Sequence, residues 1–282
     1  MDTERSLTRQ FAVRRIDEGR TARVIDDVAA EEPLEIRVVH WFKNVPVSDS
    51  LAMTMRTPGH DRELAAGFLL TEGIIQGCSQ LVELRPLGPE PSNEIVAVLS
   101  KDVDLENWRV ARNSFIHSSC GVCGKKSREA VMERVSRPLD SDFHVSADLI
   151  GTLPDLLRGH QQGFSKTGGL HAAALVNSRG EMQAVFEDIG RHNALDKLIG
   201  YCVLNDRMPL RDALLFLSSR SSFELILKAV VARAPILATV GGPSSLAIEA
   251  AREHALTLVG FVRGRRFNVY SGEWRVDSTI ES

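Results

Sequence analysis

Cysteine is scarce in this chain, which has four in 282 residues. That number is too small for a disulfide-stabilised scaffold, and a chain of this length can bury a hydrophobic core without cross-links. No segment approaches the roughly 18 consecutive apolar residues that a membrane-spanning helix needs. The amino terminus is charged and lacks the apolar stretch of a signal peptide. We therefore expect a cytoplasmic protein without a membrane partner.

An excess of charge of one sign is also missing. The 34 basic and 37 acidic residues give a formal net charge of −3. A protein that binds nucleic acid over a large surface usually carries a clear basic excess. The composition therefore argues against a nucleic-acid partner and leaves room only for a local basic patch.

The pattern of apolar residues divides the chain near residue 145. Residues 1–30 are polar and without periodicity, so we expect most of them to form a mobile arm. Residues 31–145 hold strand-like segments and a polar, glycine-containing loop at about 111–126, which indicates a smaller β-rich subdomain. Residues 146–282 alternate apolar strands with helices, which is typical of an α/β domain whose sheet is at least partly parallel.

Two of the cysteines, Cys120 and Cys123, form a C-x-x-C within that loop. Cationic groups nearby, at His117, Lys125 and Lys126, would favour the thiolate, which is the reactive form of cysteine. Three kinds of chemistry fit this pair: half of a zinc site, a dithiol–disulfide couple, or a thiolate that carries sulfane sulfur as a persulfide.

Zinc and dithiol chemistry each require something further from the sequence. The zinc site would need histidine ligands such as His117, His171 or His192, because there is no second C-x-x-C. A thioredoxin-type pair is expected early in a βαβ unit, whereas this pair follows a loop deep in the chain. The other two cysteines, Cys78 and Cys202, stand alone, and we expect them to pack as apolar residues.

Zinc nucleoside deaminases also combine a histidine with C-x-x-C, through the motifs H-x-E and P-C-x-x-C. Here Ala173 occupies the position of the catalytic glutamate after His171, and Ser119 replaces the proline before Cys120. Metal-dependent nucleotide hydrolysis is therefore not expected, although a related fold is compatible with the pattern.

Polar residues gather around glycines at the ends of two predicted strands, in TGGLH at 167–171 and EDIGRHN at 187–193. Ligands of α/β sheets bind beyond such strand ends, so Asp188, Arg191 and His192 are candidates to line a pocket. The alternative is structural, with an ion pair between Asp188 and Arg191 and with His192 bonded to backbone carbonyl groups.

Two further segments suggest anion binding. The loop GGPSS at 241–245 lies between a strand and a helix, where free backbone N–H groups favour phosphate. The segment FVRGRR at 261–266 places three arginines at the end of an apolar strand, and guanidinium groups pair bidentately with phosphate. The alternative for the arginines is a solvated turn. Between these segments, Ser221 and Glu224 match a capping box that opens a helix.

Taken together and in this order, the segments SSCGVCGK, TGGLHAAAL, FEDIGRHNALDKLIG, SSFELILK, GGPSSLAIEAA and LVGFVRGRRFNVYS resemble the formate dehydrogenase accessory sulfurtransferases of the FdhD/NarQ family. EEPLEI and MRTPGHDRELAAGFLLTEGII are similar to the amino-terminal part of that family. The resemblance extends over about residues 30–272.

The resemblance implies a fold and a function. It implies an α/β fold with a mixed sheet flanked by helices, similar to cytidine deaminases, and a homodimer. It implies a carrier that takes persulfide sulfur from a cysteine desulfurase and passes it to molybdenum in bis-molybdopterin guanine dinucleotide, which activates apo-formate dehydrogenase. The competing hypothesis is a zinc-stabilised chaperone of formate dehydrogenase without enzymatic activity.

The resemblance also assigns residues. Cys120 matches the persulfide-carrying position, with Cys123 as its partner. The expected contacts of the guanine-dinucleotide cofactor are Phe261, Val262, Arg263, Gly264, Arg265 and Arg266 from the arginine segment, and Thr167, Gly168, His171, Asp188, Arg191 and His192 from the glycine-containing strand ends. No resident metal ion is expected.

Overall fold

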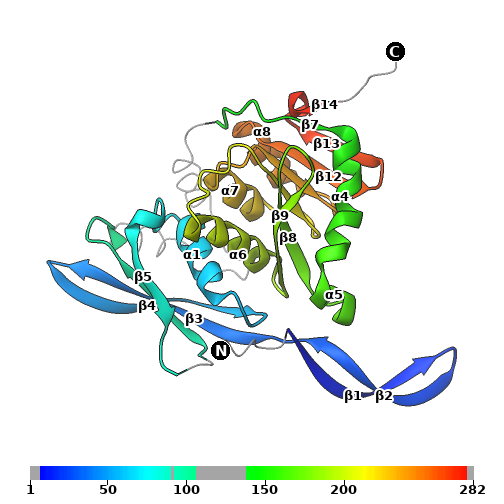
Figure 1. Ribbon diagram of the computed structural model, residues 1–282, viewed down its shortest axis with the longest axis horizontal. Helices are drawn as coiled ribbons and strands as arrows, with labels where there is room; N and C mark the ends of the chain where they lie inside the picture. Colours follow the sequence, from blue (N-terminus) through cyan, green and yellow to red (C-terminus); the bar gives the residue numbers. More distant parts are fainter. Residues whose placement is uncertain (1–6, 90–91, 106–137, 278–282) are drawn as a thin grey trace.

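The computed structural model describes residues 7–89, 92–105 and 138–277. It is a mixed α/β structure with a six-stranded and a four-stranded sheet (Figure 1). The predicted loop with Cys120 and Cys123 lies outside the described residues. Within the described ranges, no helix is long and apolar enough to cross a membrane.

The larger sheet has the strand order β13-β12-β11-β10-β8-β9. Its central strands β10, β11 and β12 are parallel, and the other three pair antiparallel, so the predicted partly parallel sheet is confirmed. The strand bounds are β8 (His171–Val176), β9 (Met182–Asp188), β10 (Leu214–Leu217), β11 (Ile236–Thr239), β12 (Thr257–Arg263) and β13 (Arg266–Ser271).

Helices cover both faces of this sheet because its central strands are apolar on both sides. Alternate residues of β10 enter two separate cores: Leu215 and Leu217 face one, and Leu214 and Phe216 face the other. Helices α6 (Arg191–Leu204), α7 (Phe223–Val231) and α8 (Ser245–Glu253) pack on the first face, and α4 (Ala147–His160) packs on the second. The short helix α5 (Gln162–Thr167) connects α4 to β8.

The smaller sheet has the order β4-β3-β6-β5, with β3 (Glu32–Phe42), β4 (Val45–Arg56), β5 (Leu81–Pro86) and β6 (Glu94–Leu99). A helix, α1 (Asp61–Thr71), follows β4 and packs against α6. Buried residues of β3 and α1, such as Leu34 and Leu64, belong to the same core as α6 and α7. The β-rich amino-terminal part therefore shares its core with the α/β part. Two short strands, β7 (Val145–Ser146) and β14 (Val276–Asp277), pair near the carboxyl end of the described chain.

Two glycines allow α1 and α6 to approach at backbone distance. A Cβ atom on Gly67 would lie 1.9 Å from the carbonyl oxygen of Asp196, and one on Gly200 would lie 1.7 Å from the carbonyl oxygen of Glu63. Both distances are far below van der Waals contact, and both neighbours are backbone atoms. The crossing of these helices therefore requires glycine at both positions.

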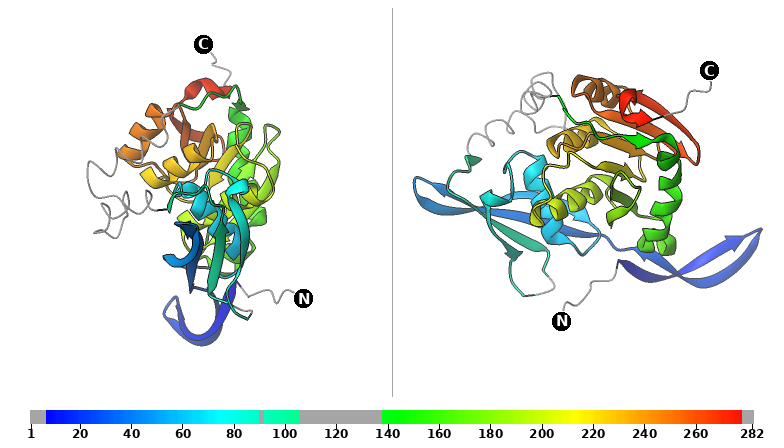
Figure 2. Two further views of the ribbon diagram at one scale, coloured as in Figure 1. Left: turned by 90° about the vertical axis from the view of Figure 1, so that its left-hand side faces the viewer. Right: turned by 45° about the horizontal axis from the view of Figure 1, so that its top comes forward.

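The amino-terminal segment differs from the sequence prediction. Within the segment that we expected to be mostly a mobile arm, residues 8–29 form an antiparallel hairpin of β1 (Thr8–Asp17) and β2 (Arg20–Ala29). Its two-residue turn, Glu18-Gly19, has positive φ at both positions, as the tightest hairpin turns require. The hairpin projects away from the rest of the molecule and contacts α5 near its base (Figures 1 and 2). The strands were not predicted because the hairpin is largely exposed on both faces, so its residues are mostly polar on both sides.

Candidate functional site

One edge of the larger sheet collects most of the predicted site residues. The parallel strands β10, β11 and β12 end there, β8 begins there and β9 ends there. Helices α6, α7 and α8 begin at the same edge, directly after β9, β10 and β11. Amino-terminal helix ends carry free N–H groups and a positive partial charge, so this edge favours anions.

Backbone hydrogen bonds join the segments of this edge. The amide of Ala172 donates to Ser218 Oγ at 2.9 Å, and the amide of Ser218 donates to the carbonyl of Ala172 at 3.0 Å. The amide of Gly241 donates to Ser219 O at 3.0 Å, and that of Phe261 donates to Gly241 O at 3.1 Å. The start of β8, the loops after β10 and β11, and Phe261 of β12 are thus connected in a row along the edge.

Phe261 occupies an unusual backbone conformation, with a φ of 55°. Its ring lies against the glycine loop, since a Cβ atom on Gly242 would be 2.4 Å from Phe261 Cζ. The side chain of Phe261 is exposed, whereas its neighbour Val262 is fully buried in the core. Of this pair, only Phe261 has a side chain that a ligand could reach.

The three arginines lie around the turn between β12 and β13. Arg263 pairs with Arg266 across the hairpin, and Gly264 takes the left-handed conformation with a φ of 54°. Arg265 approaches Asp148 at 3.9 Å, but both side chains are largely exposed, so this contact adds little stability. Arg263 and Arg266 repel each other, because they are like charges directly opposite one another. Among the described residues none of the three arginines has a buried counter-ion, so the turn is an open cationic surface.

A cluster of two imidazoles and a guanidinium lies at the β8 and β9 end of the edge. Burial lowers the pKa of His171, and the positive charges of Arg191 and His192 lower it further, against the opposing effect of Asp188. His192 Nε2 lies 3.0 Å from Glu224 Oε2 and 3.4 Å from Ser222 Oγ. The cluster therefore brings two imidazole rings and a guanidinium close to one another.

Glu224 departs from the predicted capping box. Helix α7 begins after Ser222 instead of Ser221, and no side chain caps it. Burial raises the pKa of Glu224, but the hydrogen bond and charge of His192, together with Lys228, outweigh burial and lower it. The glutamate thus fixes an imidazole of the cluster. Ser221 Oγ is buried without a hydrogen-bond partner among the described residues.

Asp188 neither lines a pocket nor pairs with Arg191, the two interpretations that the sequence suggested. It is fully buried, and its ion-pair partner is Lys197, at 2.7 Å, and not Arg191. His192 bonds to side chains and not to backbone carbonyls. Because both oxygens of Asp188 bond within the protein, this carboxylate supports the cluster and has no exposed surface for a ligand.

Thr167 and Gly168 shape the loop before β8. The hydroxyl of Thr167 donates to the carbonyl of Gly163 at 2.9 Å and accepts from the amide of Gly169 at 3.1 Å. Gly168 ends α5 with a φ of 65°. The threonine side chain is therefore engaged within its own loop.

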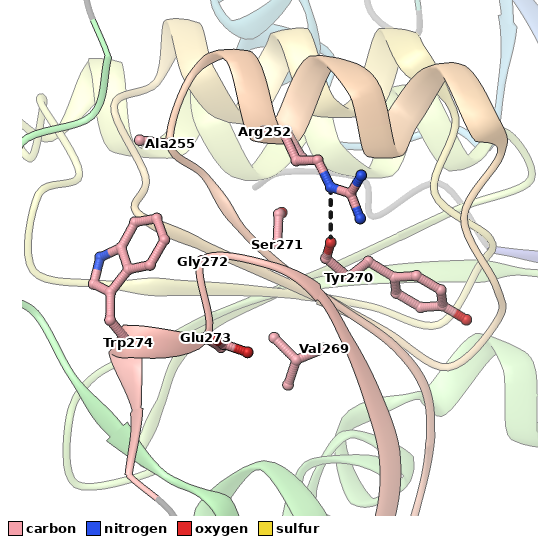
Figure 3. Close-up of a pocket in the computed structure, with 9 residues that line it drawn as sticks. Arg252, Ala255, Val269, Tyr270, Ser271, Gly272, Glu273 and Trp274 are labelled. Atoms are coloured by element: carbon pink, nitrogen blue, oxygen red, sulfur yellow. Dashed lines mark hydrogen bonds between the residues drawn. The ribbon is translucent and has the colours of Figure 1, made fainter.

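A separate cavity of about 390 Å³ lies at the opposite end of α8, where Arg252 Nε donates to the carbonyl of Tyr270 and Trp274 flanks the opening (Figure 3). It contains none of the predicted site residues. Within the described ranges, no group of three or more acidic, histidine or cysteine side chains is arranged to hold a metal ion. Of the cysteines described, Cys202 is buried, and burial raises its pKa to about 11, which agrees with a packing role.

Sequence reasoning missed Lys197 and misinterpreted Glu224. Both lie inside the motifs that were singled out, FEDIGRHNALDK and SSFE. An unusual signal was available for Lys197, because this lysine falls among apolar positions of a predicted helix, where a charge needs a buried partner. The sequence alone could not identify that partner.

Comparison with known proteins gives the same family that the motifs indicate. The model of the FdhD/NarQ family matches residues 29–277. The Sulfur carrier protein FdhD of Streptomyces avermitilis is 42% identical over 278 residues, covering 96% of both chains. That of Sulfolobus acidocaldarius is 40% identical over 269 residues, covering 95% of this chain and 98% of the relative.

A solved structure shows the same fold. The crystal structure of a protein described as a formate dehydrogenase accessory protein, from Desulfotalea psychrophila, superposes with a TM-score of 0.74 at 22% identity. It covers 96% of this chain and all of the other. From the match of the family model and the identity to these relatives, this chain belongs to the FdhD/NarQ family.

Proposed function

We propose that this protein is a cytoplasmic sulfurtransferase that accepts persulfide sulfur from a cysteine desulfurase on Cys120 and transfers it to the molybdenum of bis-molybdopterin guanine dinucleotide. The observation that carries the proposal is family membership over residues 29–277, with relatives named as sulfur carriers. Apo-formate dehydrogenase then receives the cofactor that carries the transferred sulfur.

Sulfur exchange chemistry defines the first step. The Cys120 thiolate attacks the terminal sulfur of the donor persulfide, a new S–S bond forms at Cys120, and the donor thiolate leaves. In the second step the S–S bond of the persulfide breaks and its terminal sulfur leaves as sulfide for the molybdenum of the cofactor. The two electrons come from a thiolate that forms a disulfide with Cys120, and Cys123 is the neighbouring thiol for this role. The cofactor is the substrate of this reaction and not a resident group.

The described sheet edge supplies the features that a guanine dinucleotide needs. Its phosphates would meet the exposed guanidinium groups of the β12–β13 turn, the helix amino termini and the cluster of His171, Arg191 and His192. Phe261 and the cluster lie at different points of the edge, with the loops after β10 and β11 between them. The arginine turn continues from Phe261 toward the first turns of α4. An elongated ligand fits this arrangement better than a single phosphate.

Replacement of Arg263 and Arg265 by alanine is expected to weaken GDP binding at least tenfold, because two charge-assisted contacts are lost. Isothermal titration calorimetry measures the Kd. Arg85→Ala is the control, since Arg85 is an exposed arginine in β5 of the smaller sheet. An unchanged Kd in the double variant would remove the arginines from the site.

GDP is expected to bind more tightly as the pH falls from 8 to 6. Burial and the positive charges of Arg191 and His192 lower the pKa of His171. A bound phosphate raises that pKa, so binding takes up protons and is favoured at lower pH. His171→Gln should reduce the proton uptake, measured by calorimetry in buffers of different ionisation enthalpy. His144→Gln, at an exposed histidine paired with Asp277, should leave the uptake as in the wild type.

We propose further that the β1–β2 hairpin is part of a homodimer contact. A two-stranded hairpin alone is marginally stable in water, and Phe11 and Val28 leave 51% and 41% of their surface exposed on one of its faces. Phe11→Lys with Val28→Lys is expected to weaken the dimer at least tenfold in sedimentation velocity. Leu87→Lys, at an exposed loop position, is the control. A dimer of wild-type affinity in the hairpin variant would place the contact elsewhere.

A further inference from the structure

Thr57 connects the amino-terminal part of the chain to the turn between β9 and α6. It follows β4 directly and is fully buried. Its amide donates to Asp188 Oδ2 at 3.1 Å, and its hydroxyl accepts from the amide of Ile189 at 3.1 Å. Its carbonyl accepts from Lys197 Nζ at 2.8 Å. All three polar groups of this threonine are thus bonded to one distant segment.

The carboxylate of Asp188 accepts four hydrogen bonds in the same place. Oδ2 accepts from Lys197 Nζ at 2.7 Å and from the Thr57 amide. Oδ1 accepts from the Gly190 amide at 2.8 Å and from Asn193 Nδ2 at 3.3 Å. Asn193 also donates to the carbonyl of Met55 at 2.7 Å, which adds a second link to the end of β4. The carboxylate therefore spans both ends of the turn.

Lys197 completes the group from the second turn of α6. Besides Asp188 and Thr57, its ammonium donates to the carbonyl of Glu187 at 3.4 Å. Its side chain and that of Asp188 are both 0% exposed. A buried ion pair contributes little net stability compared with apolar side chains of the same size, but it holds its neighbours in one geometry when every donor and acceptor is satisfied. Here the neighbours are the residues of the β9–α6 turn.

We infer that Thr57, Asp188 and Lys197 are positioning residues that hold Arg191 and His192 at the ligand edge from the amino-terminal part of the chain. The turn that they fix is followed at once by these two residues. A guanidinium and an imidazole at the start of a helix bind phosphate only if the helix start is held in register with the loops after β10 and β11. This inference rests on the proposed function for the identity of the ligand, but the positioning itself is measurable without ligand.

Thr57→Val tests the inference with a side chain of the same shape, because it removes only the acceptor of the Ile189 amide. Thr57→Ser restores that acceptor. Thr71→Val is the matched control on α1: Thr71 Oγ1 accepts from Lys228 Nζ at 2.8 Å and donates to Asp196 Oδ1 at 2.9 Å, in a second buried cluster. All three variants are compared at a temperature well below their melting temperatures.

The first measurement is NMR of the imidazole Cε1–H signals in the ligand-free protein. We expect the signals of His171 and His192 to shift in Thr57→Val and to keep their wild-type positions in Thr57→Ser and Thr71→Val. Unchanged signals in Thr57→Val, or equal changes in Thr71→Val, would overturn the inference, whatever the protein binds.

The second measurement is the Kd for GDP as a probe of the guanine-dinucleotide site. We expect binding about tenfold weaker in Thr57→Val, with wild-type affinity in Thr57→Ser and Thr71→Val. A wild-type Kd in Thr57→Val would overturn the inference. If the wild-type protein did not bind GDP while Thr57→Val still moved the histidine signals, the positioning would stand and the proposed ligand would be wrong.

Discussion

Cys120→Ala is expected to reduce activation of formate dehydrogenase to background, because the atom that accepts the sulfane sulfur is removed. The same variant should gain no sulfur when incubated with a cysteine desulfurase and cysteine, whereas the wild-type protein should gain the mass of one sulfur atom by intact mass spectrometry. Cys78→Ala is the control, since Cys78 is a free, half-buried cysteine at the start of a short 3₁₀ helix.

Cys123→Ala tests whether the second cysteine releases the sulfur by forming a disulfide or holds the persulfide in exchange. If Cys123 releases the sulfur by forming a disulfide with Cys120, the variant should load sulfur normally and fail to activate the client enzyme. Full activation by Cys120→Ala would contradict the persulfide role. Stoichiometric zinc in the purified protein would then favour the zinc-stabilised chaperone of formate dehydrogenase.

Gly200→Ala is expected to be the most destabilising single-methyl substitution in the described core. The added Cβ would lie 1.7 Å from Glu63 O, and 2.6 Å from the amide nitrogen of Gly67. Backbone atoms of a packed helix cannot move aside, so α1 and α6 must separate, at a cost of about 3 kcal/mol or more. For a chain of this size that corresponds to a fall in melting temperature of roughly 10 °C, measurable by calorimetry.

Gly159→Ala provides the control for Gly200→Ala. Gly159 also lies in a helix, α4, but a Cβ atom there would meet nothing within 4 Å. Alanine should stabilise this position by about 0.5–1 kcal/mol, because glycine loses more conformational entropy in a helix. If Gly200→Ala melted like Gly159→Ala, the two helices would not cross at backbone distance.

Much of the carboxyl-terminal fold was predictable from local patterns. The apolar runs at 214–217, 236–239 and 257–263 were recognisable as buried strands because helices cover both faces of the sheet, so nearly every side chain is apolar. The β1–β2 hairpin was not recognisable, since neither of its faces is buried and its side chains follow no alternation. Its signal was the Glu18-Gly19 turn, which is short and easily overlooked.

The candidate site also has one part that the sequence predicted and another that it did not. The sequence alone determined the family, the glycine loops beside strand ends and the arginine turn, because each of these depends on residues close together in the chain. Only the tertiary structure decided that Asp188 pairs with Lys197 and Thr57, and that Glu224 holds His192. The physical reason is that a buried charge pairs with whichever group the packing of strands and helices brings near. Thr57 lies 131 positions from Asp188 in the sequence, and local periodicity cannot predict a contact between residues that far apart.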